Sequence, residues 1–268
     1  MLIKAKHNCK NFINYILKFF GLRIISRKFY ETSINNKELV RHFEVLRKIK
    51  KAENIHEYIK NIPYSTSQTN RVPMDLFVLQ YLNFKKDGYF VEFGAANGKH
   101  LSNTFLMEKK FSWRGILCEP ARGFQEVLKN NRNCIIENVC VWNKSNEFLE
   151  FIETDTPEHS SIKSFSLLDK IAHLRKSGKR YKVKTITLND LLSKHNAPNE
   201  MDYLSIDTEG SEFEILESLN HEKYKFKFIT SEHMYTPKRE KIYNLLLSKG
   251  YRRIFENFSL QDDWYVRD

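Results

Sequence analysis

The stretch DGYFVEFGAANG, residues 87–98, places a short apolar run directly before a glycine turn. The aromatic and β-branched residues on either side of Glu92 are typical of a strand buried on both faces. Glu92 interrupts this run at a point where a carboxylate is costly to bury without a partner. Gly94 and Gly98, with small residues between them, then predict a tight turn into a helix. Such a turn directs backbone N–H groups to the carboxyl end of a sheet, where open α/β sheets bind their ligands.

The glycine spacing narrows the choice of ligand. Gly94 and Gly98 form Gly-x-x-x-Gly, and the sequence contains neither Gly-x-Gly-x-x-Gly nor a phosphate loop that ends in Gly-Lys-Ser/Thr. The turn is therefore not built for a pyrophosphate. A glycine turn preceded by an acidic residue suits a cationic, amine-bearing ligand such as S-adenosylmethionine. The same stretch also fits an ordinary strand-to-helix turn that binds nothing.

Length and composition favour a globular α/β protein. The chain has 268 residues, enough for one α/β domain with an extra segment, and its 41% of hydrophobic residues argue against wholesale disorder. Of the formal net charge of +11, about +9 lies in the first 60 residues, so the remainder is close to neutral. The four cysteines form no Cys-x-x-Cys pair and no zinc-ligand spacing. We therefore expect a reducing, cytoplasmic compartment.

The N-terminal segment is basic and amphipathic. Apolar residues recur at helical spacing within residues 1–30 between lysines and arginines, and the run is too short and interrupted to span a bilayer. This pattern predicts either a peripheral helix on an anionic membrane surface or a helix docked on the protein. A second amphipathic helix is expected over residues 35–62. A polar linker, 63–72, follows, so we divide the chain into a helical segment, 1–70, and a domain, 71–268.

Three further residues are candidates to bind a ligand, one after the glycine turn and one near the end of each of the next two strands. Ser102, in the stretch after the glycine turn, is expected to cap the helix over residues 101–110 or to touch a ligand. Glu119 ends the strand 115–119, and an acidic residue at this position of a nucleotide-binding α/β fold takes ribose hydroxyls. Asn138, near the end of the strand 134–141, is a candidate to face an adenine edge.

The fourth and fifth strands end in carboxylates and a histidine. Asp207 and Glu209 follow the strand 201–207, where paired carboxylates can orient a ligand amine, bind a divalent ion or act as a general base. Capping of the next helix is the alternative. Glu232 and His233 arrive at the same sheet edge after the fifth strand. A histidine there is either a proton acceptor or a hydrogen-bonded structural residue.

Strands and helices alternate from residue 89 onward. This order predicts a mainly parallel sheet with helices on both faces, and the antiparallel-looking end of the chain suggests the seven-stranded, Rossmann-like sheet of class I methyltransferases. Residues 148–153 and 181–188 alternate in the manner of strands and predict an added hairpin or edge. The polar stretch between them, 154–180, predicts either a substrate loop or lid, or a mobile surface loop.

Several motifs taken together resemble the FkbM-type methyltransferases. They are VEFGAANG, LSNT, WRGILCEP, YLSIDTEGSE, the Glu-His pair after the fifth strand, and the terminal DDWYV. The resemblance covers about residues 72–268, in the expected order and spacing.

The resemblance implies an S-adenosylmethionine-dependent O-methyltransferase that acts on hydroxyls such as those of sugars. It implies roles by position for three groups of residues. Those expected to hold the methionine part of the cofactor are Glu92, Gly94, Ala95, Asn97 and Gly98. Glu119 would take the ribose, and the transferred methyl group would be surrounded by Asp207, Glu209 and His233. A divalent metal ion held by Asp207 and Glu209 is an open alternative.

Three functions remain in competition at this point. The first is methylation of a sugar hydroxyl in a surface glycan or glycolipid precursor, at the cytoplasmic membrane face. The second is RNA methylation, which the net charge suggests, although the charge lies away from the expected pocket and no RNA-binding module is evident, so nucleic acid is not the expected partner. The third is a non-catalytic interaction protein on a methyltransferase scaffold. The sequence does not fix the acceptor or the oligomeric state.

Overall fold

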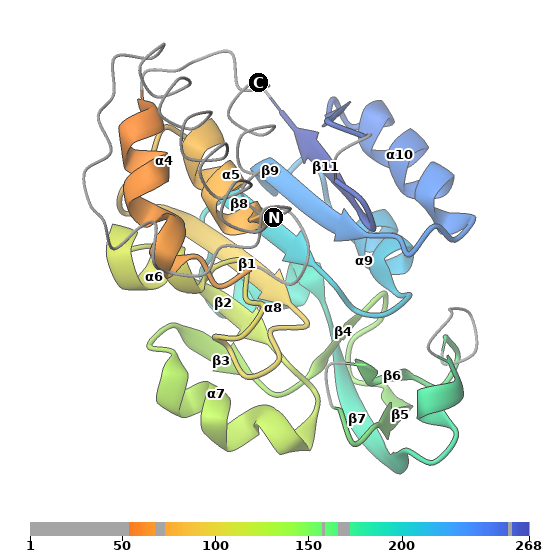
Figure 1. Ribbon diagram of the computed structural model, residues 1–268. Helices are drawn as coiled ribbons and strands as arrows, with labels where there is room; N and C mark the ends of the chain where they lie inside the picture. The colour runs from red at the N-terminus through yellow and green to blue at the C-terminus, as the bar shows by residue number, and fades with distance from the viewer. Residues whose placement is uncertain (1–53, 68–72, 157–158, 166–171, 257–258, 268) are drawn as a thin grey trace, which may run out of the picture. The chain divides into compact units, whose positions relative to one another are not determined.

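A computed structural model describes residues 54–67, 73–156, 159–165, 172–256 and 259–267 (Figure 1). The chain divides into two units, 1–40 and 41–268, and all the described residues belong to the second. The predicted membrane-surface helix in residues 1–30 and the predicted domain boundary at residue 70 lie outside the described residues. Part of the helix expected over residues 35–62 is present as α4, Ile55–Asn61.

The described residues form a mixed seven-stranded sheet with the order β10-β11-β9-β8-β1-β2-β3. Strands β9, β8, β1, β2 and β3 are mutually parallel, and β11 runs antiparallel to both of its neighbours. The sheet is therefore mixed and not wholly parallel. Its strands are β1 (Tyr89–Phe93), β2 (Arg114–Cys118), β3 (Ile135–Glu137), β8 (Glu200–Ile206), β9 (Lys225–Glu232), β10 (Arg252–Ile254) and β11 (Asp262–Val266).

Helices cover both faces of this sheet. Side chains of α8, α9 and α10 share one core cluster with Val91 and Leu204, which point to one face of the central strands. On the opposite face, Phe77 of α5 packs its ring against Phe228 and Trp264. The helices after α4 are α5 (Met74–Tyr81), α6 (Phe105–Phe111), α7 (Gln125–Asn131), α8 (Leu188–Lys194), α9 (Glu212–Ser218) and α10 (Lys238–Ser248). Short 3-10 turns lie at Ile62–Tyr64, Arg122–Phe124 and Ala172–Arg175.

A second sheet of four strands lies within the described residues, in the order β4-β7-β5-β6 (Figure 1). Its strands are β4 (Cys140–Trp142), β5 (Phe148–Glu153), β6 (Ser161–Ile162) and β7 (Lys179–Thr187). The runs 148–153 and 181–188, predicted to form an added hairpin or edge, correspond to β5 and β7, which pair antiparallel. Part of the polar stretch between these strands supplies β6, which pairs with β5, and is not wholly a loop.

The prediction of one strand over residues 134–141 was wrong. The run divides at Asn138 and Val139 into β3, which pairs with β2, and β4, which pairs with β7 of the second sheet. Cys140 is thereby buried in the core cluster of the second sheet, while its neighbour Val141 packs on the main one. A continuous apolar run does not reveal such a change of partner, because both halves have the same periodicity.

Helix α6 begins four residues later than expected. The helix was predicted from residue 101, but Ser102, Asn103 and Thr104 form a non-helical approach to Phe105. These residues direct hydrogen bonds to Glu92. The helix therefore begins later than expected because these three residues supply the hydrogen bonds that the buried Glu92 carboxylate needs. In the described part of the chain, no helix is both long and apolar enough to cross a membrane.

Candidate functional site

The turn after β1 packs directly on the end of β8. Gly94 has φ +72°, and a Cβ atom added there would lie 1.8 Å from the backbone oxygen of Asp207. The Gly94 N–H donates to the carbonyl oxygen of Cys118, and the Asp207 N–H donates to that of Phe93. The ends of β1, β2 and β8 are therefore joined at this turn, which only glycine fits.

Glu92 is buried and held by protein donors. Its carboxylate accepts hydrogen bonds from the Ser102 and Thr104 hydroxyls and from the Asn103 N–H. Arg132 lies 3.6 Å away, and its side chain has no exposed surface. Arg132 also donates to the carbonyl oxygen of Gly98. The partner that the buried carboxylate requires is thus an arginine at the end of α7, which the sequence did not reveal.

Glu119 closes β2 at the predicted place. One carboxylate oxygen accepts the N–H of Ala96 at 2.9 Å, and the other accepts the N–H of Ala121 at 2.8 Å. Burial raises the pKa of Glu119 to about 7, although the hydrogen bonds from Ala121 and Ala96 oppose this shift. Each oxygen keeps a free lone pair, so the carboxylate is still able to accept hydroxyls of a ligand.

A cleft opens at the carboxyl ends of β1, β2 and β8. Four of the predicted cofactor residues line it, namely Glu92, Gly94, Glu119 and Asp207. The other predicted cofactor residues are not part of this lining and are Ala95, Asn97, Gly98, Ser102 and Asn138. Asn97 accepts hydrogen bonds from the backbone at Lys99 and His100, and the Asn138 amide faces the carbonyl oxygen of Glu119 at 3.4 Å.

The second sheet supplies part of the cleft wall. Phe151 of β5, Ile162 of β6 and Ser160, just before β6, line the cleft, although they lie far along the chain from the glycine turn. Their approach depends on the fold, so no local signal identifies them individually. Further lining residues lie within or next to the sequence motifs but were not predicted as site residues. They are Ala96, His100, Leu101, Asn103, Ser205, Thr208 and Ser211.

The turn after β8 directs Glu209 toward the cleft. Glu209 has φ +56°, a left-handed conformation that is uncommon for a residue with a side chain. The buried Glu212 carboxylate holds this turn, because it accepts the Thr208 N–H and hydroxyl and the Gly210 N–H. Arg175, from the segment between β6 and β7, donates to Glu209 at 3.0 Å.

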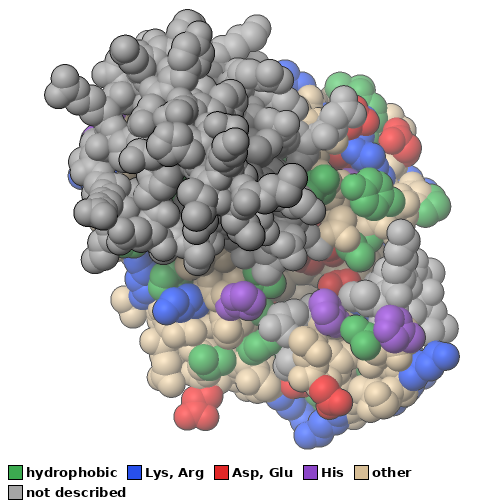
Figure 2. Space-filling view, viewed as in Figure 1, with side chains coloured by type: hydrophobic (Ala, Val, Ile, Leu, Met, Phe, Trp, Pro, Cys, Tyr) green, Lys and Arg blue, Asp and Glu red, His purple; other side chains and the backbone are tan. Residues whose placement is uncertain are grey.

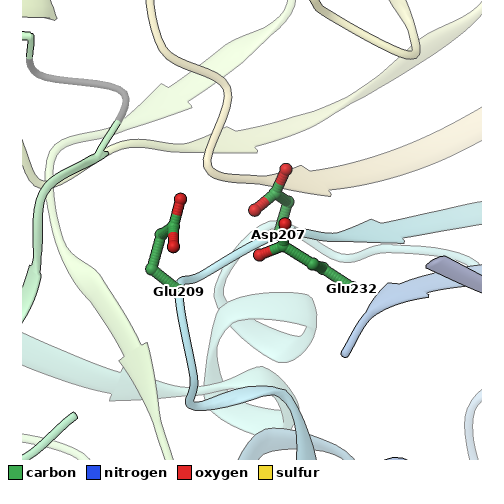
Figure 3. A group of neighbouring side chains, drawn as sticks. All are labelled: Asp207, Glu209 and Glu232. Atoms are coloured by element: carbon green, nitrogen blue, oxygen red, sulfur yellow. The ribbon is translucent and has the colours of Figure 1, made fainter. Parts of the chain in front are cut away.

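Asp207, Glu209 and Glu232 form a carboxylate cluster at the edge of the sheet. Figure 3 shows Asp207 and Glu232 converging from neighbouring strand ends, with Glu209 facing them from the turn. One carboxylate oxygen from each residue lies within 4.8 Å of the others. Burial raises the pKa of Glu232 well above its usual range, and the charges of Asp207 and Glu209 raise it further. The sequence placed Glu232 at this edge, but His233, and not Glu232, was predicted as the catalytic residue there.

The environment of His233 favours a structural role. The side chain is buried, and its Nδ1 accepts the N–H of Tyr235 at 2.9 Å. The ring proton of the neutral form therefore resides on Nε2, which lies 3.7 Å from Asp263. Burial lowers the pKa of His233 to about 4. Since its basic nitrogen is already occupied, His233 does not offer a lone pair to a substrate in this conformation, and its predicted catalytic role stays a prediction.

A second pocket adjoins the cleft in the described part of the chain. Its lining includes Glu209, Glu232 and His233, and Glu209 lines both pockets. Figure 2 shows acidic side chains recessed between the second sheet, at the lower right, and the region of α10 above it. The arrangement offers room for two ligands that meet at the carboxylate cluster.

The sheet order, with one antiparallel strand and a cleft at the ends of the central parallel strands, defines a Rossmann-like α/β fold of the class I methyltransferase type. The sequence matches the family model described as "Methyltransferase FkbM domain" over residues 92–253. The chain belongs to this family, as the motifs had indicated. No curated protein matches the sequence.

The chain is also weakly similar to solved structures, some of which are described as methyltransferases. Precorrin-6Y C5,15-methyltransferase from Geobacter metallireducens GS-15 is 11% identical, with a TM-score of 0.37, over 72% of this chain and 85% of that one. The TDP-rhamnose 3′-O-methyltransferase CalS11, of calicheamicin biosynthesis, is 14% identical, with a TM-score of 0.38, over 88% and 96%. A mutant of MtNAS in complex with S-adenosylmethionine is 11% identical, with a TM-score of 0.33, over 86% and 70%. These similarities do not identify a substrate.

Proposed function

We propose that this protein transfers a methyl group from S-adenosylmethionine to a hydroxyl of a sugar in a glycan or glycolipid precursor. The observation that carries the proposal is the pair of adjoining pockets at the carboxyl end of the sheet, in a chain of the FkbM methyltransferase family. The first pocket has the features of a nucleoside site. The second has acceptors for hydroxyl groups.

The residues of the first pocket fit S-adenosylmethionine by their chemistry. Glu119 would accept the ribose hydroxyls, and Gly94 would let the ligand approach the backbone closely. Val139 and Val141 line the same cleft and offer an apolar surface for an adenine ring. Bound S-adenosylmethionine would supply a sulfonium methyl group that is already activated for transfer. The task left to the chain is to align the acceptor oxygen and to exclude water.

The carboxylates of the second pocket favour a neutral, hydroxyl-rich acceptor. Glu209 and Glu232 line this pocket and would accept hydrogen bonds from hydroxyls. Asp207 lines the cleft beside them and would accept the proton of the acceptor hydroxyl. A sugar hydroxyl is a weak acid, so a nearby base would contribute to the rate.

Transfer of a labelled methyl group tests this proposal. The full chain is incubated with methyl-labelled S-adenosylmethionine and two fractions of cells that lack the gene, carbohydrate and total RNA. We expect label in the carbohydrate fraction, and we expect Asp207→Asn to lower the rate by about 100-fold or more. Glu126→Gln, an exposed carboxylate on α7, serves as the matched control and should leave the rate unchanged. Label in RNA and not in carbohydrate would contradict the proposed acceptor.

A further inference from the structure

We propose that Asp207, Glu209 and Glu232 form a binding site for a hard divalent cation, of the Mg²⁺ or Mn²⁺ type, at the junction of the two pockets. The register of the sheet explains why these side chains meet. Ile206 of β8 pairs with Ser231 of β9, so the next residue of each strand emerges at the same edge. The left-handed turn at Glu209 then adds a third carboxylate, within 4.8 Å of the other two.

The charge of the cluster leaves room for a cation. Three carboxylates within this distance repel one another strongly when they are partly withdrawn from water. Arg175 contributes one positive charge through its contact with Glu209 at 3.0 Å. Lys238, which lines the second pocket, pairs with Glu214 at 2.6 Å and donates to the carbonyl oxygen of Gly210. A divalent cation would offset the repulsion that remains among these carboxylates.

An unsatisfied atom of Glu232 points independently to a ligand. Only 4% of Glu232 is exposed, yet its Oε2 atom has no hydrogen-bond partner among the described residues. A buried acceptor without a partner is unfavourable, and more so when it is charged. Because Glu232 lines the second pocket, a group bound there can reach it. Coordination of a cation would satisfy this oxygen and the charge of the cluster together.

The ligand atoms select the kind of cation. The cluster consists of carboxylates, without histidine or cysteine among the described residues that form it. Oxygen ligands suit Mg²⁺, Mn²⁺ and Ca²⁺, whereas nitrogen and sulfur ligands favour Zn²⁺ and Cu²⁺. Since Glu209 lines both pockets, a cation held here would lie where an acceptor hydroxyl meets the cofactor cleft. Polarisation of that hydroxyl would be its contribution, and this role rests on the proposed function.

Binding of Mn²⁺ to the full chain, without S-adenosylmethionine or acceptor, tests the site directly. Chelator-treated protein is titrated with MnCl₂, and free Mn²⁺ is followed by electron paramagnetic resonance. We expect one saturable site. Glu232→Gln keeps the shape of the side chain but removes a charged ligand, and it should weaken binding by about tenfold or more. Glu217→Gln changes an exposed carboxylate of α9 and should bind Mn²⁺ as the unaltered chain does.

Melting curves show whether Glu232→Gln is folded, so that unfolding of the variant is not mistaken for loss of the Mn²⁺ site. Glu232→Gln keeps the size of the side chain and places no charge beside Asp207 and Glu209, so its melting temperature without metal should equal or exceed that of the unaltered chain. Saturating Mn²⁺ should raise the melting temperature of the unaltered chain and change that of Glu232→Gln much less. Absence of saturable binding, or equal binding by Glu232→Gln, would overturn the proposal. Because no cofactor is present, metal binding without methyl transfer would leave the site intact and remove only the proposed function.

Discussion

Gly94 leaves no space for a side chain, and this makes it the most sensitive position of the cleft. A Cβ atom there would meet the backbone of Asp207, whereas one at Gly250 would have nothing within 4 Å, although both glycines have positive φ. Gly250→Ala should therefore cost only the backbone term, about 1 kcal/mol. We expect Gly94→Ala to cost roughly 3 kcal/mol or more, because it adds a clash with backbone. Urea unfolding of both variants measures the difference, and equal costs would show that the turn readily moves.

The raised pKa of Glu119 predicts a dependence of stability on pH. The carboxyl ionises at its ordinary pKa of 4.5 when the chain is unfolded and at about 7 in the native state. Between these values the native state binds more protons, so this residue's contribution to stability falls as the pH rises from about 4.5 to 7. A shift of this size corresponds to on the order of 3 kcal/mol.

Replacement of Glu119 isolates this contribution. The free energy of unfolding of Glu119→Gln, minus that of the unaltered chain, should increase by on the order of 3 kcal/mol between pH 4 and pH 8. Other titrating groups affect both proteins and cancel in the difference. Urea unfolding at several pH values provides the measurement. A difference that stays constant with pH would mean that Glu119 ionises normally in the folded protein.

At the scale of elements, Arg132 connects α7 to its surroundings. It donates to Glu108 of α6 at 2.8 Å and to the carbonyl oxygen of Gly98, and it lies beside Glu92 of β1. Arg132→Met would leave buried carboxylates without a partner and should lower the free energy of unfolding by about 3–5 kcal/mol. The exposed Arg114, at the start of β2, is the control. Arg114→Met should change the free energy of unfolding by no more than about 0.5 kcal/mol.

A double variant distinguishes the loss of charge pairing from the loss of packing. If Glu92 is destabilised because its partner is missing, Glu92→Gln combined with Arg132→Met should cost less than the sum of the two single changes. We expect a coupling free energy of about 1–3 kcal/mol. Strict additivity would show that the two residues act independently and would contradict the network described here.

Local patterns were sufficient for the elements but not for all of their partners. The strands around Val91, Leu204 and Ile229 follow from apolar runs in the sequence. The change of sheet at Asn138 was missed, because it depends on which strand lies alongside and not on periodicity.

The same limit applies to the candidate site. Glu119 and Asp207 could be placed from their positions at strand ends, and both line the cleft. Arg132 and Arg175 could not, since each is a basic residue on a polar stretch until the fold brings a carboxylate to it. Glu232 was visible in the sequence, but its burial and its unpartnered oxygen are properties of the packed sheet.

At the scale of the whole molecule, the fold brings two pockets to one edge of the sheet and builds the wall of the first partly from the second sheet. Family membership assigns a methyltransferase domain to this architecture. Binding of S-adenosylmethionine in the first pocket is the central claim, since the proposed reaction and the role of the carboxylate cluster in it depend on that binding.

Calorimetric titration of the full chain with S-adenosylmethionine tests this claim most directly. We expect saturable binding in the micromolar range, or about −8 kcal/mol. Glu119→Gln should remain folded and weaken binding by about tenfold or more, because a charged acceptor for the ribose hydroxyls is lost. The exposed Glu126→Gln should bind as the unaltered chain does. Absence of binding, or equal binding by Glu119→Gln, would contradict the placement of the cofactor in this cleft.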